Sequence, residues 1–217
     1  MIRIPIKYGR NYSLVVLGVD PGIRTTGLSI VGLDNAGQYC CLGSQYIETK
    51  KQDKKSINQL RTNIDDFKRY SEIYQELENL YLSFSGIRNQ SISAVAVESY
   101  TVMGPIFDKK QGKAIMGNSA WKSAVVYGGI LFWALSKQLY VAPFLPSDIK
   151  KRFGKKDKSK EGIQLAVESE VSNFYEEIHK YPKTKREHVS DATAHAVLLI
   201  EEIKKNKIFI GGFNATI

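Results

Sequence analysis

Two short apolar segments rich in β-branched residues flank a Pro-Gly pair early in the chain. The first, Val15–Val19, does not alternate with polar residues, which is typical of a strand buried on both faces. Pro21 and Gly22 favour a turn before the second segment, Leu28–Val31. The pattern therefore predicts a hairpin, and Asp20 lies where its first strand ends.

The later periodicity predicts strands and helices in an α/β order. Further strands are expected at Tyr39–Ile47, Ile92–Glu98 and Tyr140–Ala142, and helices at Gln59–Phe84, Ser119–Lys137, Lys160–Ile178 and from Glu187 to about Ile203. The first helix has an aromatic stripe, including Phe67 and Phe84, that we assign to the core. The segment Tyr100–Asn118 contains several glycines and no clear period, so a long loop is expected there.

Length and composition indicate one domain. With 217 residues and 43% hydrophobic content, we expect an N-terminal extension (1–13), a single domain (14–206) and a C-terminal tail (207–217). No apolar run approaches the length of a membrane span, and the segment Met1–Arg10 has no apolar core of signal-peptide length, so neither membrane association nor secretion is expected. Cys40 and Cys41 are adjacent, where a disulfide would be strained, which favours reduced thiols and a cytoplasmic location.

The net charge of +9 favours a polyanionic partner, because a basic surface attracts nucleic acid through its phosphates. A dense basic run precedes and enters the helix predicted from Lys160. A charge run is usually only a solvated surface, but one this dense repels itself unless phosphates neutralise it. We assign DNA contacts to its lysines, Lys150, Lys151, Lys155, Lys156, Lys158 and Lys160.

Two carboxylates follow buried strands. Asp20 ends the first strand, and Glu98 ends the strand that begins at Ile92. A carboxylate at such a position is costly unless it is paired or binds a cation. Asp20 alone would equally suit a turn, and an exposed strand-end Glu is common. The repetition of the arrangement favours a site at the carboxyl edge of the sheet.

The last helix begins with a third candidate group. His188 and Asp191 are three residues apart, so they share one face of its first turn and could ligate the same metal. The simpler interpretation is that an acid there stabilises the helix N-terminus. Glu187 is the alternative to His188 as a ligand. His195, two turns along the helix, is interpreted as structural.

The motif Asp20-Pro21-Gly22-x-Arg24-x-Thr26-Gly27, with the later Glu98 and the His188/Asp191 pair, resembles the RuvC family of Holliday junction resolvases in the RNase H-like nuclease superfamily. The similarity extends over residues 14–203. It implies an RNase H-like α/β fold, a mixed five-stranded sheet with helices on both faces. It also implies that the four named ligand candidates hold two Mg²⁺ or Mn²⁺ ions. Many bacterial members have a second Asp where this chain has His188.

By resemblance, the chain is a homodimeric endonuclease that nicks four-way DNA junctions symmetrically, leaving 5′-phosphate and 3′-hydroxyl ends. The family dimerises through the helix that corresponds to Ser119–Lys137, where Ala120, Ala124 and Gly128 form a row of small residues. The alternatives are an RNase H-like nuclease on other branched DNA or RNA/DNA hybrids, and a catalytically inactive junction-binding module.

The resemblance also assigns DNA contacts outside the acids. The family places an aromatic residue after the Glu, for which Tyr100 and Phe107 are equal candidates. Two family lysines important for activity correspond to Lys150 and Lys160, with Lys151 and Lys158 as alternatives because the spacing differs by about one residue. The remaining basic candidates lie in the hairpin turn and the long loop: Arg24, Lys109, Lys110 and Lys113.

Overall fold

The computed structural model describes residues 12–50, 59–88, 91–99, 106–108, 113–115 and 118–208. The central sheet consists of β1 (Tyr12–Asp20), β2 (Thr25–Asp34), β3 (Tyr39–Glu48), β4 (Ala94–Glu98), β7 (Tyr140–Phe144) and β8 (Val171–Ser172). A separate ribbon pairs β5 (Ile106–Asp108) with β6 (Lys113–Ile115). The helices are α1 (Gln59–Arg88), α2 (Asn118–Ser136), α3 (Pro146–Arg152), α4 (Lys160–Glu170), α5 (Phe174–Ile178), the 3₁₀ helix η2 (Lys183–Lys185) and α6 (Arg186–Asn206).

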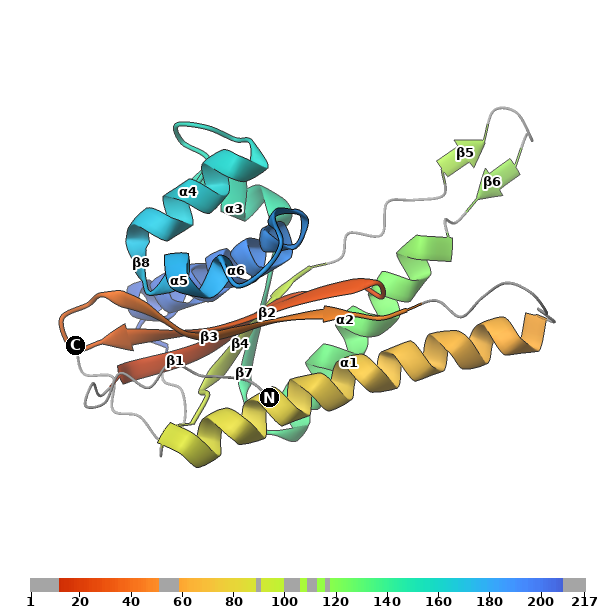
Figure 1. The fold of residues 1–217 in the computed structure, drawn as a ribbon, viewed down its shortest axis with the longest axis horizontal. Coiled ribbons are helices and arrows are strands. Elements are labelled where there is room, and N and C mark those ends of the chain that lie inside the picture. Colours follow the sequence, from red (N-terminus) through yellow and green to blue (C-terminus); the bar gives the residue numbers. More distant parts are fainter. Residues whose placement is uncertain are drawn as a thin grey trace.

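The sheet is mixed, with strand order β7-β4-β1-β2-β3-β8. The first three strands form an antiparallel meander, and β4 and β7 join it in parallel beside β1. Helices cover both faces (Figure 1). The predicted fold class is therefore confirmed, with six strands where the sequence predicts five.

The sixth strand interrupts the helix predicted over Lys160–Ile178. Helix α4 ends at Glu170, because Val171 and Ser172 pair with Tyr39 and Cys40 at the edge of the sheet. Asn173 then takes a left-handed conformation (φ 63°), from which α5 begins. A two-residue strand leaves no periodicity of its own, so the apolar pattern continues through it.

Two other segments contain elements that the sequence does not predict. The expected loop Tyr100–Asn118 includes the β5–β6 ribbon. Helix α3 forms where only a strand exit and a basic run are predicted. Pro146 occupies its first turn, and the Leu145 N–H donates to the Asp148 carboxylate at 2.8 Å, which caps the helix.

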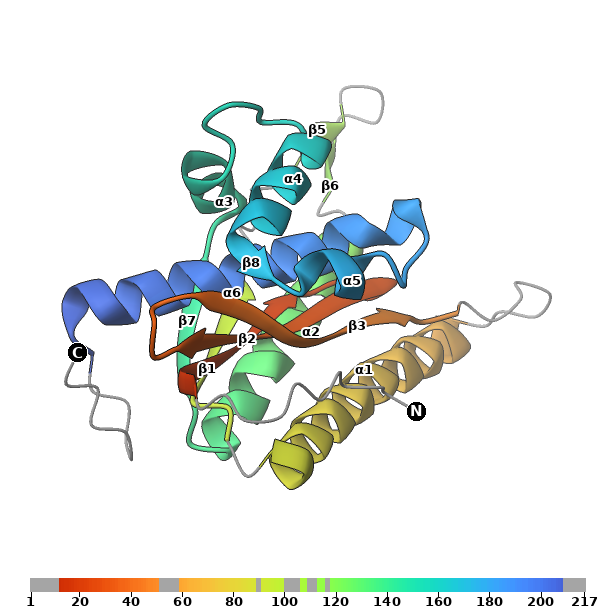
Figure 2. The ribbon, with the colours of Figure 1, turned by 60° about the vertical axis from the view of Figure 1, so that its left-hand side comes forward.

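The two faces of the sheet have separate cores, and Figures 1 and 2 show that different helices lie on them. Helices α1 and α2 cover one face, where Leu77, Phe84 and Ile130 are buried. Phe67, assigned to this core from the sequence, is instead 69% exposed. Helix α6 lies along β1, β2 and β4 on the other face, with α3, α4 and α5 packed around it. Within the described residues, no helix is both long and apolar enough to cross a bilayer.

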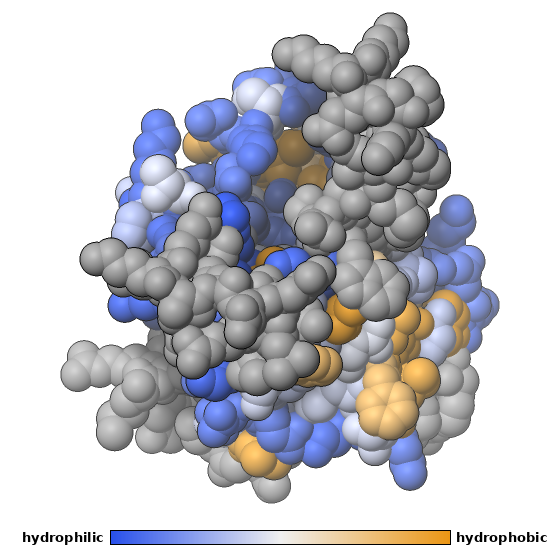
Figure 3. Space-filling view, turned by 90° about the vertical axis from the view of Figure 1, so that its right-hand side faces the viewer, coloured by the Kyte–Doolittle hydropathy of each residue, from blue (hydrophilic) through white to orange (hydrophobic). Residues whose placement is uncertain are grey.

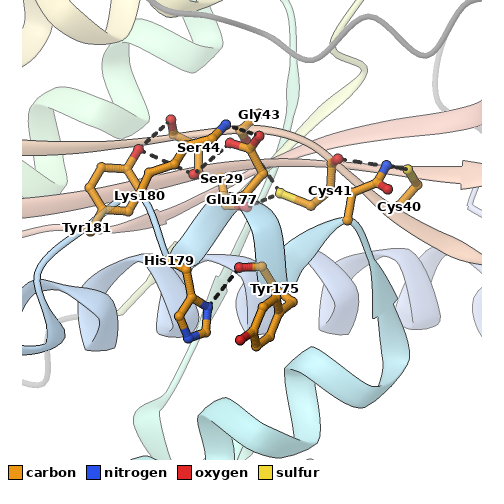
Figure 4. Close-up of polar contacts among 11 residues, drawn as sticks. Ser29, Cys40, Cys41, Gly43, Ser44, Tyr175, Glu177, His179, Lys180 and Tyr181 are labelled. Carbon is orange, nitrogen blue, oxygen red and sulfur yellow. Dashed lines mark hydrogen bonds and ion pairs between the residues drawn. The ribbon is translucent and has the colours of Figure 1, made fainter.

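A polar cluster fastens α5 to β3 (Figure 4). The Glu177 carboxylate is buried there, where it accepts a hydrogen bond from Ser44 Oγ at 3.3 Å and pairs with Lys180. Tyr181 Oη donates to the Ser44 carbonyl at 2.7 Å. Because η2 and α6 follow directly, the cluster fixes the approach of the chain to the start of α6.

Candidate active site

Two carboxylates emerge side by side from the centre of the sheet. Asp20 is the last residue of β1, and Glu98 is the last residue of β4. The two strands are parallel neighbours, with Val19 opposite Val97. The carboxylates therefore leave the same edge of the sheet, as the sequence predicts.

Helix α6 can reach this edge because two glycines let it lie against the strands. A Cβ on Gly18 would be 1.8 Å from the Ala192 carbonyl oxygen, and one on Gly27 would be 2.1 Å from the His188 carbonyl oxygen. Any larger residue at either position would push the helix away. The close packing brings the first turns of α6, with His188 and Asp191, over the strand ends.

His188 contacts Asp20 directly. Its Nδ1 lies 2.6 Å from Asp20 Oδ2, and Tyr46 packs beside its ring with centroids 5.9 Å apart. The hydrogen bond to Asp20 raises the pKa of His188, and burial raises the pKa of Asp20 although His188 opposes that shift. Both directions favour a proton held between the two side chains.

The pKa of Asp191 shows how burial and the neighbouring carboxylates act on this site. Burial, followed by the negative charges of Asp20 and Glu98, raises its pKa to about 7. Three carboxylates thus lie close enough to oppose one another's ionisation, and the local positive charge does not offset this. Such a cluster is a favourable place for a cation.

Glu98 also has a histidine partner. His195 Nε2 lies 3.2 Å from Glu98 Oε2, and the ring is completely buried beside Phe144, with centroids 6.2 Å apart. The sequence interpretation of His195 as structural missed this contact. Its spacing of seven residues from His188 places both on one face of α6, which is the signal that could have identified it.

Lys160 is the member of the basic run that reaches the acids. Its Nζ donates to Glu187 Oε2 at 2.7 Å. That hydrogen bond raises the pKa of Lys160, and the negative charges of Glu187, Asp191 and Asp20 act in the same direction. Glu187, the alternative ligand, is thus occupied by a lysine in this arrangement.

The site fits a divalent metal in its chemistry but is not closed around one. Within the described residues, no three His, Cys, Asp or Glu side chains are arranged to hold an ion. Asp20 and Glu98 each have an oxygen within hydrogen-bonding distance of a histidine. Three carboxylates and one imidazole at the edge are nonetheless a suitable donor set for Mg²⁺ or Mn²⁺.

The remaining residues predicted to contact DNA fall into two groups. Arg24 and the basic run form exposed surface, in which Lys150, Lys151, Lys155, Lys156 and Lys158 accompany Lys160 on α3, α4 and the turn between them. The rest lie outside the described part of the chain: Tyr100, Lys109 and Lys110 entirely, and Phe107 and Lys113 in their side chains.

Comparisons with known proteins agree with this geometry. The family model for "Crossover junction endodeoxyribonuclease RuvC" matches residues 16–84. Thermus thermophilus RuvC in complex with Holliday junction substrate superposes with a TM-score of 0.60 at 21% identity, over 88% of this chain and 96% of that chain. A second Thermus thermophilus RuvC structure gives 0.60 and 21%, over 89% and 97%. The fowlpox virus Holliday junction resolvase gives 0.50 and 12%, over 88% and 99%. No curated protein sequence matches the chain.

These similarities confirm two of the sequence predictions. The fold is RNase H-like and of the RuvC type. The resemblance to the RuvC family seen in the Asp20 motif is confirmed over the matched segment, residues 16–84. The matched segment contains Asp20 but not Glu98, His188 or Asp191. The roles of these three residues therefore rest on their geometry.

Proposed function

We propose that this chain is a metal-dependent endonuclease that resolves four-way DNA junctions. The observation that carries the proposal is the convergence of Asp20, Glu98 and Asp191 at one edge of a RuvC-type sheet, where burial and their mutual repulsion raise the pKa of Asp191 to about 7. The structures that share this fold include resolvases, one of them in complex with a Holliday junction substrate.

Asp20, Glu98, His188 and Asp191 would hold two Mg²⁺ or Mn²⁺ ions. When bound, such ions supply a water of lowered pKa as the nucleophile and stabilise the leaving 3′ oxygen, which gives 5′-phosphate and 3′-hydroxyl products. An imidazole nitrogen binds a metal only when it carries no hydrogen, so His188 would bind through Nε2 while Nδ1 keeps its contact with Asp20, or through Nδ1 without the proton there. Lys160, beside the acids, would neutralise the phosphate at the cleaved bond.

The fourth ligand is His188 in this proposal and Glu187 in its alternative, and two variants decide between them. His188 contacts Asp20, whereas Glu187 pairs with Lys160, which favours His188. His188→Ala should therefore lose most cleavage, and Glu187→Ala should retain it. A fully active His188→Ala beside an inactive Glu187→Ala would instead make Glu187 the ligand.

The basic run supplies the DNA surface in this proposal. Its lysines lie on α3, α4 and the intervening turn, and Lys160 connects this surface to the catalytic edge. A phosphate backbone that follows the run would therefore be led toward the acids. The strong positive net charge of the chain favours the same polyanionic partner.

A homodimer would place two such sites on one junction. Helix α2 presents an apolar stripe to solvent, in which Phe132 is 76% and Leu135 65% exposed, and a Cβ added to Gly128 would meet no atom within 4 Å. On the side that Figure 3 views, exposed hydrophobic residues are most numerous toward the lower right, and others lie in separate places toward the top and the bottom. The row predicted for dimerisation overlaps this stripe at Ala124 and Gly128, while the side chain of Ala120 lies outside the described residues.

The decisive experiment compares substrates at matched sequence. The protein is incubated with Mg²⁺ or Mn²⁺ and with four-way, three-way, flap, RNA/DNA hybrid and linear duplex molecules, each with an EDTA control. We expect paired, ligatable nicks in the four-way junction. Preferential cleavage of the hybrid would support the general nuclease instead, and junction binding without any cleavage would support the inactive binding module.

A further inference from the structure

The two strand-end acids have different histidine partners. His188, next to Asp20, is 25% exposed in its side chain, whereas His195, next to Glu98, is completely buried. In the part of the chain that the structure describes, His195 Nδ1 is buried and has no hydrogen-bond partner. The only polar contact of the His195 ring among those residues is therefore with Glu98.

This asymmetry indicates which ring nitrogen carries the hydrogen. A buried N–H without an acceptor is more costly than a buried lone pair, so the arrangement favours the tautomer with its hydrogen on Nε2. Nε2–H then donates to Glu98 Oε2 across 3.2 Å. Phe144 on β7 packs beside the ring and limits its rotation.

We propose that His195 is a positioning residue that holds the Glu98 carboxylate at the metal-binding edge. Glu98 has a flexible side chain that is 26% exposed, and it shares the edge with the negative charges of Asp20 and Asp191. Without a donor, that repulsion would turn the carboxylate toward water. The inference rests on the proposed function, since it assumes that Glu98 binds the divalent cation.

His195 acts through Glu98 and is not itself a ligand. Nε2 faces the Glu98 carboxylate, and the ring is completely buried. The competing interpretation is that His195 only fills space between α6 and the sheet. The two interpretations differ in whether the N–H or the volume of the side chain matters.

A matched pair of variants separates them. His195→Gln keeps an N–H donor near the position of Nε2, and His195→Leu keeps comparable volume without one. Mn²⁺ affinity is measured by calorimetric titration without DNA, and thermal unfolding in EDTA reports packing. We expect His195→Leu to bind Mn²⁺ about 10- to 100-fold more weakly, the range typical of lost hydrogen bonds to metal ligands, and His195→Gln to recover most of that loss.

Wild-type Mn²⁺ affinity in His195→Leu, or equal weakening in both variants, would overturn the proposal. A double-mutant cycle adds a test that is independent of folding defects. In a Glu98→Gln background, His195→Leu should cause no further loss of Mn²⁺ affinity, because the group it positions is already gone. A further loss of the same size as in the wild type would show that His195 acts elsewhere.

Failure of this inference and failure of the proposed function give different experimental results. A protein that binds Mn²⁺ in a His195-dependent manner but cuts no junction would refute the function and keep this inference. A protein that resolves junctions equally well with His195→Leu and unchanged Mn²⁺ affinity would do the reverse. Absence of Mn²⁺ binding by the wild type would overturn the inference.

Discussion

The two faces of the sheet differ in what they expose. The α6 face carries the acids, both histidine partners and the basic run. On the α1–α2 face, Phe67, Phe132 and Leu135 are each more than 60% accessible, and Leu165 and Tyr175 on α4 and α5 are exposed to a similar extent. The candidate site and the basic run thus lie on one side of the protein, and the exposed apolar stripe of α2 lies on the other.

Polar contacts between α1 and α2 hold these two helices together. Trp133 Nε1 donates to Glu78 at 2.7 Å, Lys122 pairs with Asp66, and Tyr74 Oη donates to the Val125 carbonyl at 3.1 Å. The α1–α2 layer is therefore already held to itself by specific contacts. Its exposed apolar residues are not needed for that packing, which fits a surface used for assembly.

The largest effect is expected on the α6 face. Asp20→Asn removes one ligand charge at nearly constant size, so cleavage should fall at least about 1,000-fold, equivalent to about 4 kcal/mol of barrier, while junction binding changes little. Single-turnover cleavage and a gel-shift assay measure the two quantities. Glu176→Gln, which removes an exposed acid on α5, is the control and should cleave normally. Full activity of Asp20→Asn in Mg²⁺ would rule out the two-metal site.

The next effect tests the opposite face. A Cβ on Gly128 meets no atom within 4 Å, so Gly128→Leu should leave the fold intact and halve the mass seen by light scattering. The monomer should bind junctions without resolving them. A Cβ on Gly129 would lie 1.7 Å from Tyr74 Oη, so Gly129→Leu should lower the unfolding temperature instead. A wild-type monomer that cuts both strands would contradict the assembly role.

A smaller effect concerns the exposed lysines of the α6 face. Lys155→Ala with Lys158→Ala should weaken junction affinity and reduce the slope of log affinity against log salt by about 0.9 per lost phosphate contact. The matched control, Lys68→Ala with Lys137→Ala, removes the same charge from the α1–α2 face. Equal slopes in the two double variants would mean that net charge alone, and not this surface, determines binding.

The sequence predicts most of the fold because strands and long helices leave strong patterns. It fails where an element is too short to leave one, as in the two residues Val171 and Ser172, and where exposure depends on a neighbouring helix, as for Phe67. The site shows the same limit. Asp20 and Glu98 are recognisable as acids after buried strands, but the pairing of Glu98 with His195 depends on how closely α6 lies against Gly18.

The last effect is a dependence of stability on pH that belongs to the α6 face. The pKa of Asp191 rises from 3.8 to about 7 on folding, so the folded protein binds more protons than the unfolded chain between those values. The free energy of unfolding should therefore fall as pH increases through this window, by at most about 1.4 kcal/mol per pH unit. The raised pKa of His188 acts in the same direction, because its stabilisation is lost as pH rises through the folded value.

Urea unfolding of the metal-free protein in EDTA, from about pH 5 to 8, measures this slope. Asp191→Asn removes the titrating carboxyl and should flatten it, whereas Glu176→Gln on the surface of α5 should not. Adding Mn²⁺ should restore stability most at the highest pH, since the ion binds the ionised carboxylates and replaces the missing positive charge. If the slope of Asp191→Asn equals that of the wild type, the repulsion among the three acids is not what opposes ionisation at this edge.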